Sequence, residues 1–434
     1  MNIKRGVVSG LLKRKSVKNS AWIIAEQVYQ MAINFVLTMM VSRYLGPANY
    51  GVLNYGATLV NIFLVFTKLG LDTMISNEFI KHRDKEGVLV GTSVAMRLMS
   101  AVISTGIIAI LVFVLQFDSP LIIITSIIQS LALLFQAFNI FDYWFQSYFK
   151  SKYVSIAKAV AYTLMAGYKF WLLATGKDVV WFAASTVIDA FVVAILLFVF
   201  YKKNNGPRID INISLGKSLL KRSYHFIISG VMVLIYTQID KIMIGQMLDE
   251  YQLGLYSAAL SVCLLTSFIP DAILTSARAS VFNAKQSGQQ YLKKLKQTYA
   301  IIFWVCVAMA LVVSIAAPLI VNIIYGEQYV GAIPALSLLV WYVPISYLGT
   351  ARAIWIVTEN KNKYSKYYTF WGVLMNIGLN AFMIPLWGIF GATVATIITE
   401  LFTLFITPLF YKETRVHTKY VLEAIIFNFK GDNE

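Results

Sequence analysis

The sequence predicts an all-α integral membrane protein with twelve transmembrane helices in two pseudo-symmetric six-helix bundles. The first observation is composition, because 58% of the 434 residues are hydrophobic and only 13% are charged. A soluble domain carries about a quarter charged residues. The second observation is a series of apolar runs of about 20 residues, the length that crosses a bilayer. The third is where the basic residues lie between these runs.

The basic residues form seven short stretches that alternate with pairs of apolar runs and contain all but six of the 37 Lys and Arg. Cytoplasmic loops retain Lys and Arg, so these stretches mark one side of a membrane. Six pairs of crossings then place both termini on the cytoplasmic side. The expected spans are 21–42, 53–74, 92–115, 120–142, 154–175, 179–201, 223–246, 253–276, 298–324, 331–357, 367–387 and 390–411.

These spans divide the chain into two lobes with a polar connection between them. Residues 202–222 contain Asn204, Asn205, Gly206 and Pro207 and are expected to form a cytoplasmic linker. The segments expected around it are a basic cytoplasmic N-terminal segment at 1–20, an N-lobe of helices 1–6 at 21–201, a C-lobe of helices 7–12 at 223–411 and a cytoplasmic tail at 412–434.

A weak internal repeat supports two lobes of the same orientation. LGPANYGVL at 45–53 aligns without a gap to LDEYQLGLY at 248–256, which matches Leu45 to Leu248 and Gly51 to Gly254. Both copies lie at the first outer turn of their lobe. Because each lobe has an even number of spans, the lobes should be related by an axis along the membrane normal.

Several functions are disfavoured by composition and by the short outer connections. The net charge of +16 is explained by inward-facing basic loops and by attraction to anionic lipid, so we expect no nucleic-acid partner. An enzyme acting outside the membrane needs a loop or domain there to carry its chemistry. No metal-ligand spacing, phosphate loop or nucleophile elbow is present, so we expect a protein that is not an enzyme and has no cofactor or metal.

Ionisable and amide side chains inside the spans are the candidate functional residues. Charges are costly in lipid and should face an interior cavity or a partner. A water-filled cavity is the favoured interpretation for the charges near mid-membrane, which are Lys169, Asp189, Lys241, Arg352 and Glu400. For Lys68 and Arg97, which lie near the inner face, snorkelling or a local salt bridge is an equal alternative. The amides could instead be hydrogen-bonding contacts between helices. The residues concerned are Glu26, Gln30, Asn34, Lys68, Arg97, Lys169, Asp189, Asp240, Lys241, Arg352, Asn376, Asn380 and Glu400.

Three segments resemble a known family. TQIDKIMIG at 237–245 followed by LGLYSAA at 253–259 resembles the start of the second half in bacterial oligosaccharide-lipid flippases. SRYLGPANYG at 42–51 and the stretch from Arg352 to Tyr364 are similar to other parts of the same proteins. This superfamily also contains multidrug extruders and the lipid-linked peptidoglycan-precursor flippases.

The resemblance implies a V-shaped pair of bundles in the bacterial cytoplasmic (inner) membrane. It implies transfer of an undecaprenyl-pyrophosphate-linked oligosaccharide to the outer leaflet, coupled to proton or sodium flow, with a polysaccharide polymerase and a chain-length regulator as further partners. The family's cationic lumen corresponds here to Lys169, Lys241 and Arg352, and also to Lys68 and Arg97. Candidate ion-coupling carboxylates are Glu26, Asp189, Asp240 and Glu400, because burial can raise the pKa of a carboxyl group towards neutrality.

Two other functions are weighed against this one. A cation-coupled multidrug extruder of the same superfamily is the main alternative, although lysines in its lumen would repel cationic drugs. A membrane glycan polymerase or ligase would need a large outer loop with catalytic carboxylates, which the short outer connections disfavour.

Overall fold

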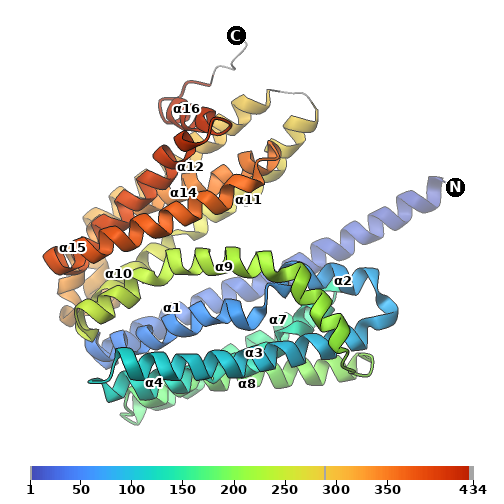
Figure 1. The fold of residues 1–434 in the computed structure, drawn as a ribbon, viewed down its shortest axis with the longest axis horizontal. Helices are drawn as coiled ribbons and strands as arrows, with labels where there is room; N and C mark the ends of the chain where they lie inside the picture. Colours follow the sequence, from blue (N-terminus) through green and yellow to red (C-terminus); the bar gives the residue numbers. More distant parts are fainter. Residues whose placement is uncertain (1, 288–289, 430–434) are drawn as a thin grey trace. The chain divides into compact units, whose positions relative to one another are not determined.

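The computed structural model describes residues 2–287 and 290–429, and the side chains of these residues other than 2–18 and 73. Within these ranges every regular element is helical, as the sequence predicts (Figure 1). The contacts divide the chain into two compact units. The first unit contains Met1–Leu45 and Val52–Leu234, and the second contains Gly46–Gly51 and Ile235–Glu434.

The first unit is built mainly from five long helices and several short ones. The long helices are α1 (Asn2–Lys68), α3 (Glu86–Leu115), α7 (Ser151–Ala174), α8 (Val179–Lys203) and the first part of α9 (Ile213–Met247). The shorter elements are η1 (Leu71–Thr73), α2 (Ile75–Lys81), η2 (Arg83–Lys85), α4 (Pro120–Ser130), α5 (Ala132–Gln136), η3 (Ala137–Asn139) and α6 (Ile140–Ser147).

The second unit has the same general construction. It contains the end of α9 and then α10 (Glu250–Thr266), α11 (Phe268–Gln286), α12 (Tyr291–Ile324), η4 (Glu327–Ala332), α13 (Ile333–Leu339), α14 (Tyr342–Thr358), η5 (Asn362–Tyr364), α15 (Ser365–Leu401), η6 (Phe402–Ile406), η7 (Thr407–Phe410) and α16 (Arg415–Ile425). The element η6 is a π-helical turn, a distortion that is often found at functional sites.

Eight helical segments are long and apolar enough to cross a membrane, or nine if the bent pair Glu327–Leu339 and Tyr342–Thr358 counts as one span; this count covers the described residues only. Two of these eight segments are much longer than one crossing of the membrane requires. Asn19–Lys68 has 50 residues and Asn362–Phe410 has 49, whereas about 20 suffice. The chain is therefore a multi-pass membrane protein.

Glycines interrupt both overlong segments. Gly46 in α1 has φ 72° and ψ 171°, and Gly388 in α15 has φ 58° and ψ −139°. A residue with a Cβ is strained at positive φ, so glycine is the natural choice at each break. In Figure 1, α1 runs away from the N-terminus and then returns towards α2. Each overlong segment is thus two helices joined at a kink.

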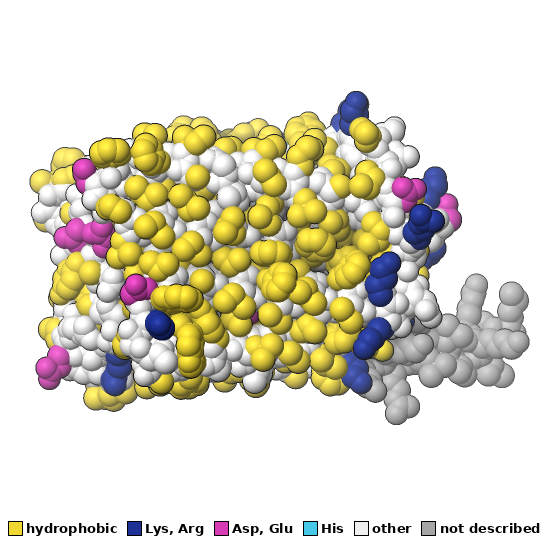
Figure 2. Space-filling model, turned by 90° about the horizontal axis from the view of Figure 1, so that it is seen from below, with side chains coloured by type: hydrophobic (Ala, Val, Ile, Leu, Met, Phe, Trp, Pro, Cys, Tyr) yellow, Lys and Arg dark blue, Asp and Glu magenta, His cyan; other side chains and the backbone are white. Residues whose placement is uncertain are grey.

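Apolar side chains cover the surface of these bundles. Ile315 of α12 is 75% exposed and Val114 of α3 is 69% exposed, which is expected where a helix faces lipid. Over the face shown in Figure 2, apolar side chains fill the middle, Lys and Arg lie mainly at one end, and Asp and Glu mainly at the other. This distribution agrees with the charge asymmetry of the sequence.

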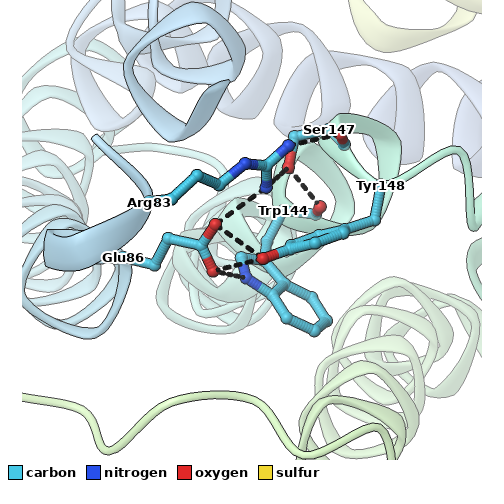
Figure 3. A network of polar contacts seen from close by, with 5 residues as sticks. All are labelled: Arg83, Glu86, Trp144, Ser147 and Tyr148. Atoms are coloured by element: carbon cyan, nitrogen blue, oxygen red, sulfur yellow. Dashed lines mark hydrogen bonds and ion pairs between the residues drawn. The ribbon is translucent and has the colours of Figure 1, made fainter. Parts of the chain in front are cut away.

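A buried carboxylate fixes the start of α3 in the first unit (Figure 3). Glu86 is 3% exposed and accepts hydrogen bonds from Trp144 Nε1 at 2.9 Å, Tyr148 Oη at 2.8 Å and Arg83 Nη1 at 2.8 Å. Three donors, one of them charged, offset the cost of burying this carboxylate. The network ties η2 and α3 to α6, and Ser147 completes it by accepting from Arg83.

The segment between α8 and α9, expected to be an interlobe linker, packs against the first unit. Asp210 donates its backbone N–H to the carbonyl of Gly87, and Asn212 donates to Thr92 Oγ1. A Cβ on Gly87 would overlap the carbonyl of Arg208, so the missing side chain makes this close approach possible. The two units separate at residues 234–235, inside α9.

The two copies of the internal repeat meet in the second unit. A Cβ on Gly51 would overlap the carbonyl oxygen of Glu250, and a Cβ on Gly254 would overlap that of Pro47. The same spacing in the chain separates Pro47 from Glu250 and Gly51 from Gly254. The contacts are therefore equivalent, and each glycine lets the backbone of the other copy approach.

Candidate functional site

A polar cavity of about 290 Å³ lies in the second unit between α9, α10, α14 and α15. Such charged and hydroxyl-bearing walls are unusual for a membrane-spanning bundle and indicate a functional site. Its lining includes Tyr236, Gln238, Asp240, Lys241, Tyr256, Tyr342, Ser346, Tyr347, Asn376, Thr396 and Glu400.

Asp240 is the most extensively hydrogen-bonded group of this cavity. It is 8% exposed and accepts from Asn380 Nδ2 at 2.6 Å, Thr396 Oγ1 at 2.8 Å and Tyr256 Oη at 3.0 Å. These donors come from α15 and α10, so the carboxylate of α9 joins three helices. Its many donors offset the cost of burying a charge.

The amides beside Asp240 form a short hydrogen-bonded chain with it. Asn380 donates to Asn376 Oδ1 at 3.0 Å, and the two residues lie one turn apart on α15. Asn380 Oδ1 is buried and accepts no hydrogen bond from any described residue. A carboxylate surrounded by carbonyl and hydroxyl oxygens is the ligand type that hard cations prefer.

Glu400 and Lys241 are the other charged residues that line the cavity. Tyr236 interacts electrostatically with Glu400 and lies one turn before Asp240 on α9. Thr396 lies one turn before Glu400 on α15. Positions one turn apart share a helix face, and this periodicity places the acidic groups of α9 and α15 on the same cavity. Its walls carry two carboxylates and one ammonium group.

Arg352 lies in α14, is not among the residues that line this cavity, and has partners of its own. It is 8% exposed, its Nη1 donates to the carbonyl of Thr403 at 2.6 Å, and its guanidinium lies 4.3 Å from the ring centroid of Tyr368. Thr403 belongs to the π-helical turn that begins two residues after Glu400. Arg352 therefore supports the backbone that positions Glu400.

The first unit contains a separate row of charged residues. Glu26 of α1 is 8% exposed and interacts electrostatically with Tyr162 of α7. Asp189 of α8 interacts electrostatically with Lys169 of α7. Asp189 Oδ1 is buried and has no hydrogen-bond partner among the described residues. The side chains of Glu26, Lys169 and Asp189 therefore lie near one another between α1, α7 and α8.

The remaining predicted residues of the first unit lie apart from that row. Arg97 is 1% exposed and its Nη2 lies 2.5 Å from Asp72 Oδ1, while Lys68 Nζ lies 3.3 Å from Asp72 Oδ2. This pairing is the local salt bridge that was the alternative interpretation. Gln30 is partly buried and Asn34 is exposed on α1.

Sequence reasoning missed the tyrosines of the cavity. Tyr236, Tyr256, Tyr342 and Tyr347 all line it, and no candidate set included them. Tyr236 was identifiable in principle, since it precedes Asp240 by one helical turn. Tyr342 and Tyr347 had no such signal, because tyrosines in apolar runs are usually assigned to the membrane interface.

Comparison with known proteins shows the family to which this chain belongs. The family model described as "Polysaccharide biosynthesis protein" matches residues 40–334, and the chain belongs to this family. It is 21% identical over 335 residues to a protein of Shigella flexneri named "Putative O-antigen transporter", which covers 72% of this chain and 77% of that protein.

Solved structures show the same fold. A lipid II flippase, MurJ, in an inward closed conformation matches with a TM-score of 0.72 and 14% identity, over 94% of this chain and 91% of that one. An inward-facing multidrug resistance transporter of the MATE family in the MOP superfamily matches with a TM-score of 0.66 and 15% identity, over 93% and 96%. The chain thus shares its fold with a lipid flippase and with a multidrug transporter.

Proposed function

We propose that this protein is a flippase that moves an undecaprenyl-pyrophosphate-linked oligosaccharide repeat unit from the inner to the outer leaflet of the bacterial cytoplasmic membrane. The family, the O-antigen transporter relative and the fold shared with a lipid flippase support this role. The observation that carries it is the cavity of Asp240, Lys241 and Glu400, because charges held inside a membrane bundle are typical of a transport path.

The proposed topology has twelve crossings in two six-helix bundles, with both termini in the cytoplasm. The breaks at Gly46 and Gly388 divide α1 and α15 into two crossings each. The bent pair α13 and α14 supplies one more, and α7, which has 24 residues, supplies the last. Alternating access would then expose the path to each side in turn.

Asp240 is the proposed coupling carboxylate. Its carboxylate oxygens, with the hydroxyl of Thr396 beside them, are ligands of the kind that a sodium ion takes, and the carboxylate itself suits a proton. Glu26, Asp189 and Glu400 are the further coupling candidates. An ion that binds only one state of the transporter shifts the equilibrium towards that state.

Lys241 is the proposed contact for the pyrophosphate, because it is the ammonium group on the cavity wall. Lys169, Lys68, Arg97 and Arg352 complete the proposed cationic set and already have the carboxylate or carbonyl partners described above. The polyprenyl tail would stay in lipid during transfer. A polysaccharide polymerase and a chain-length regulator are the proposed partners downstream.

The test is complementation of a strain that lacks this gene. We expect Asp240→Asn and Lys241→Gln each to lower surface polysaccharide about tenfold or more, with the lipid-linked repeat unit accumulating. Asp178→Asn, at an exposed outer connection, is the matched control and should export normally. Protein level is followed by immunoblot. Normal export by both cavity variants at normal protein level would contradict the proposal.

A multidrug extruder is the second candidate, and one observation favours it. The cavity contains Asp240 and Glu400 against Lys241 alone, and an excess of carboxylates suits a cationic drug. The same strains separate the two functions. Loss of resistance to cationic drugs with unchanged polysaccharide would support the extruder.

A further inference from the structure

A second hollow of the second unit lies where three of its turns meet. It has a volume of about 510 Å³ and shares no residue with the polar cavity. The turn between α9 and α10, the junction of η4 with α13 and the break in α15 at Gly388 all contribute to it. In the proposed topology these are outer connections, so this hollow opens to the outer side.

Two aromatic side chains and two polar ones face this hollow. Trp387 is 55% exposed and Phe390 is 43% exposed, on either side of Gly388. Asp249 and Gln252 contribute a carboxylate and a carboxamide. Asp249 Oδ1 accepts the backbone N–H of Gln252 at 2.7 Å, so the start of α10 is ordered around both residues.

This combination has the chemistry of a carbohydrate site. A pyranose ring presents a face of C–H groups, which packs on an aromatic ring, and a rim of hydroxyl groups, which need donors and acceptors. A carboxylate accepts hydroxyl protons, and a carboxamide both donates and accepts. The volume lies within the range of about 300–1,000 Å³ that is usual for small-molecule sites.

An aromatic belt at the membrane interface accounts for exposed tryptophans by themselves. One oxygen of Asp249 caps the start of α10, but neither this cap nor a belt accounts for the carboxamide of Gln252 in the same hollow as the tryptophan. Trp181, at the start of α8, shows the difference. It is 47% exposed and its ring lies 5.6 Å from Lys177 Nζ, as expected for an interfacial aromatic residue.

We infer that this hollow is an outer saccharide site, which binds one pyranose ring on Trp387 with its hydroxyl groups on Asp249 and Gln252. The site goes beyond the proposed flippase activity, because it gives the outer side of the second unit an affinity for sugar that is independent of the polar cavity. It rests on the proposed topology for its place on the outer side and on the proposed function for which sugar is bound.

The experiment is saturation-transfer difference NMR on the full chain in nanodiscs with free monosaccharides. The panel contains glucose, galactose, mannose, rhamnose, N-acetylglucosamine and glucuronic acid. We expect at least one pyranose to give a signal that Trp387→Ala lowers about fivefold or more and that Gln252→Ala also lowers. Trp387→Phe should retain part of the signal, and Trp181→Ala should retain all of it.

Two results would overturn the inference. One is the absence of a signal for every sugar in the panel, and the other is a signal that Trp387→Ala and Gln252→Ala leave unchanged. Gel filtration of each variant verifies folding, and Trp387→Phe preserves an aromatic ring if the alanine variant fails to fold. Asp240→Asn should bind sugar normally, which distinguishes failure of this site from failure of the flippase proposal.

Discussion

Arg352 donates to the carbonyl of Thr403 and stacks on Tyr368, so its fixed planar geometry is needed as well as its charge. We predict that Arg352→Lys loses about 1.5–3 kcal/mol of stability and most of its export, because lysine cannot reproduce the stacked donor. Thermal unfolding of the purified protein and complementation measure the two effects.

Arg278→Lys is the matched control for Arg352. Arg278 is exposed on α11, so its replacement should change neither the melting temperature nor export. If Arg352→Lys behaved like the natural protein while Arg352→Met lost export, positive charge alone would be required, and the role assigned to the π-helical turn would be wrong.

Part of the cavity could be predicted residue by residue. Asp240, Asn376, Asn380 and Glu400 are polar groups in apolar runs, and their cost in lipid makes them candidates from sequence alone. That Asn380 and Thr396 donate to Asp240 could not be predicted, because it depends on how α9 and α15 pack. A local salt bridge of Arg97 was foreseen as an alternative to a functional role, but its partner Asp72 was not.

At the scale of the helices, the paired glycines of the repeat make a specific prediction. A Cβ at Gly51 would meet backbone rather than a flexible side chain, so Gly51→Ala should destabilise the protein by about 1–3 kcal/mol. Gly106 lies in α3, and a Cβ there would have nothing within 4 Å. Gly106→Ala should therefore be neutral or stabilising by up to about 1 kcal/mol. Equal melting temperatures for both variants would refute the close contact.

The docking of α16 depends on a neutral histidine. His417 is fully buried, lies 3.2 Å from Tyr299 Oη through Nε2, and has its pKa lowered well below 6.5 by burial and by Arg352 and Lys361. The unfolded chain takes up a proton near pH 6.5 and the folded chain does not. Stability due to His417 is therefore complete above pH 6.5 and falls as the pH drops towards the folded pKa, by about 1.4 kcal/mol per unit.

Thermal unfolding between pH 5.5 and 7.5 tests this dependence. His417→Gln should have a shallower loss of stability below pH 6.5 than the natural protein. His225→Gln, at an exposed position of α9, should leave the pH dependence unchanged. Identical pH profiles for the natural protein and His417→Gln would contradict a neutral buried histidine.

The helices could be predicted from the sequence because hydropathy and length define them. The positions at which long helical segments are interrupted were harder to predict. The expected boundary between the spans 367–387 and 390–411 coincides with the break at Gly388. The interval 202–222 was expected to be a linker because it is polar. It packs on the first unit through Gly87 and Thr92, which are distant in the chain and give no local signal.

For the molecule as a whole, charge asymmetry and apolar composition were enough to predict a helical membrane protein. The transporter fold follows from the comparison with solved structures, and the family from the match over residues 40–334. Substrate chemistry is not encoded in composition, since lumenal charges of either sign are compatible with several transported molecules. The proposed substrate therefore needs a direct measurement.

That measurement is translocation in proteoliposomes loaded in the inner leaflet with a fluorescent polyprenyl-pyrophosphate-linked oligosaccharide. Membrane-impermeant quencher added outside reports headgroups that have crossed. Under a sodium or proton gradient, the natural protein should make most of the probe accessible, and Asp240→Asn should remain near the protein-free background. A rate for the natural protein that equals this background under both gradients would contradict the central claim.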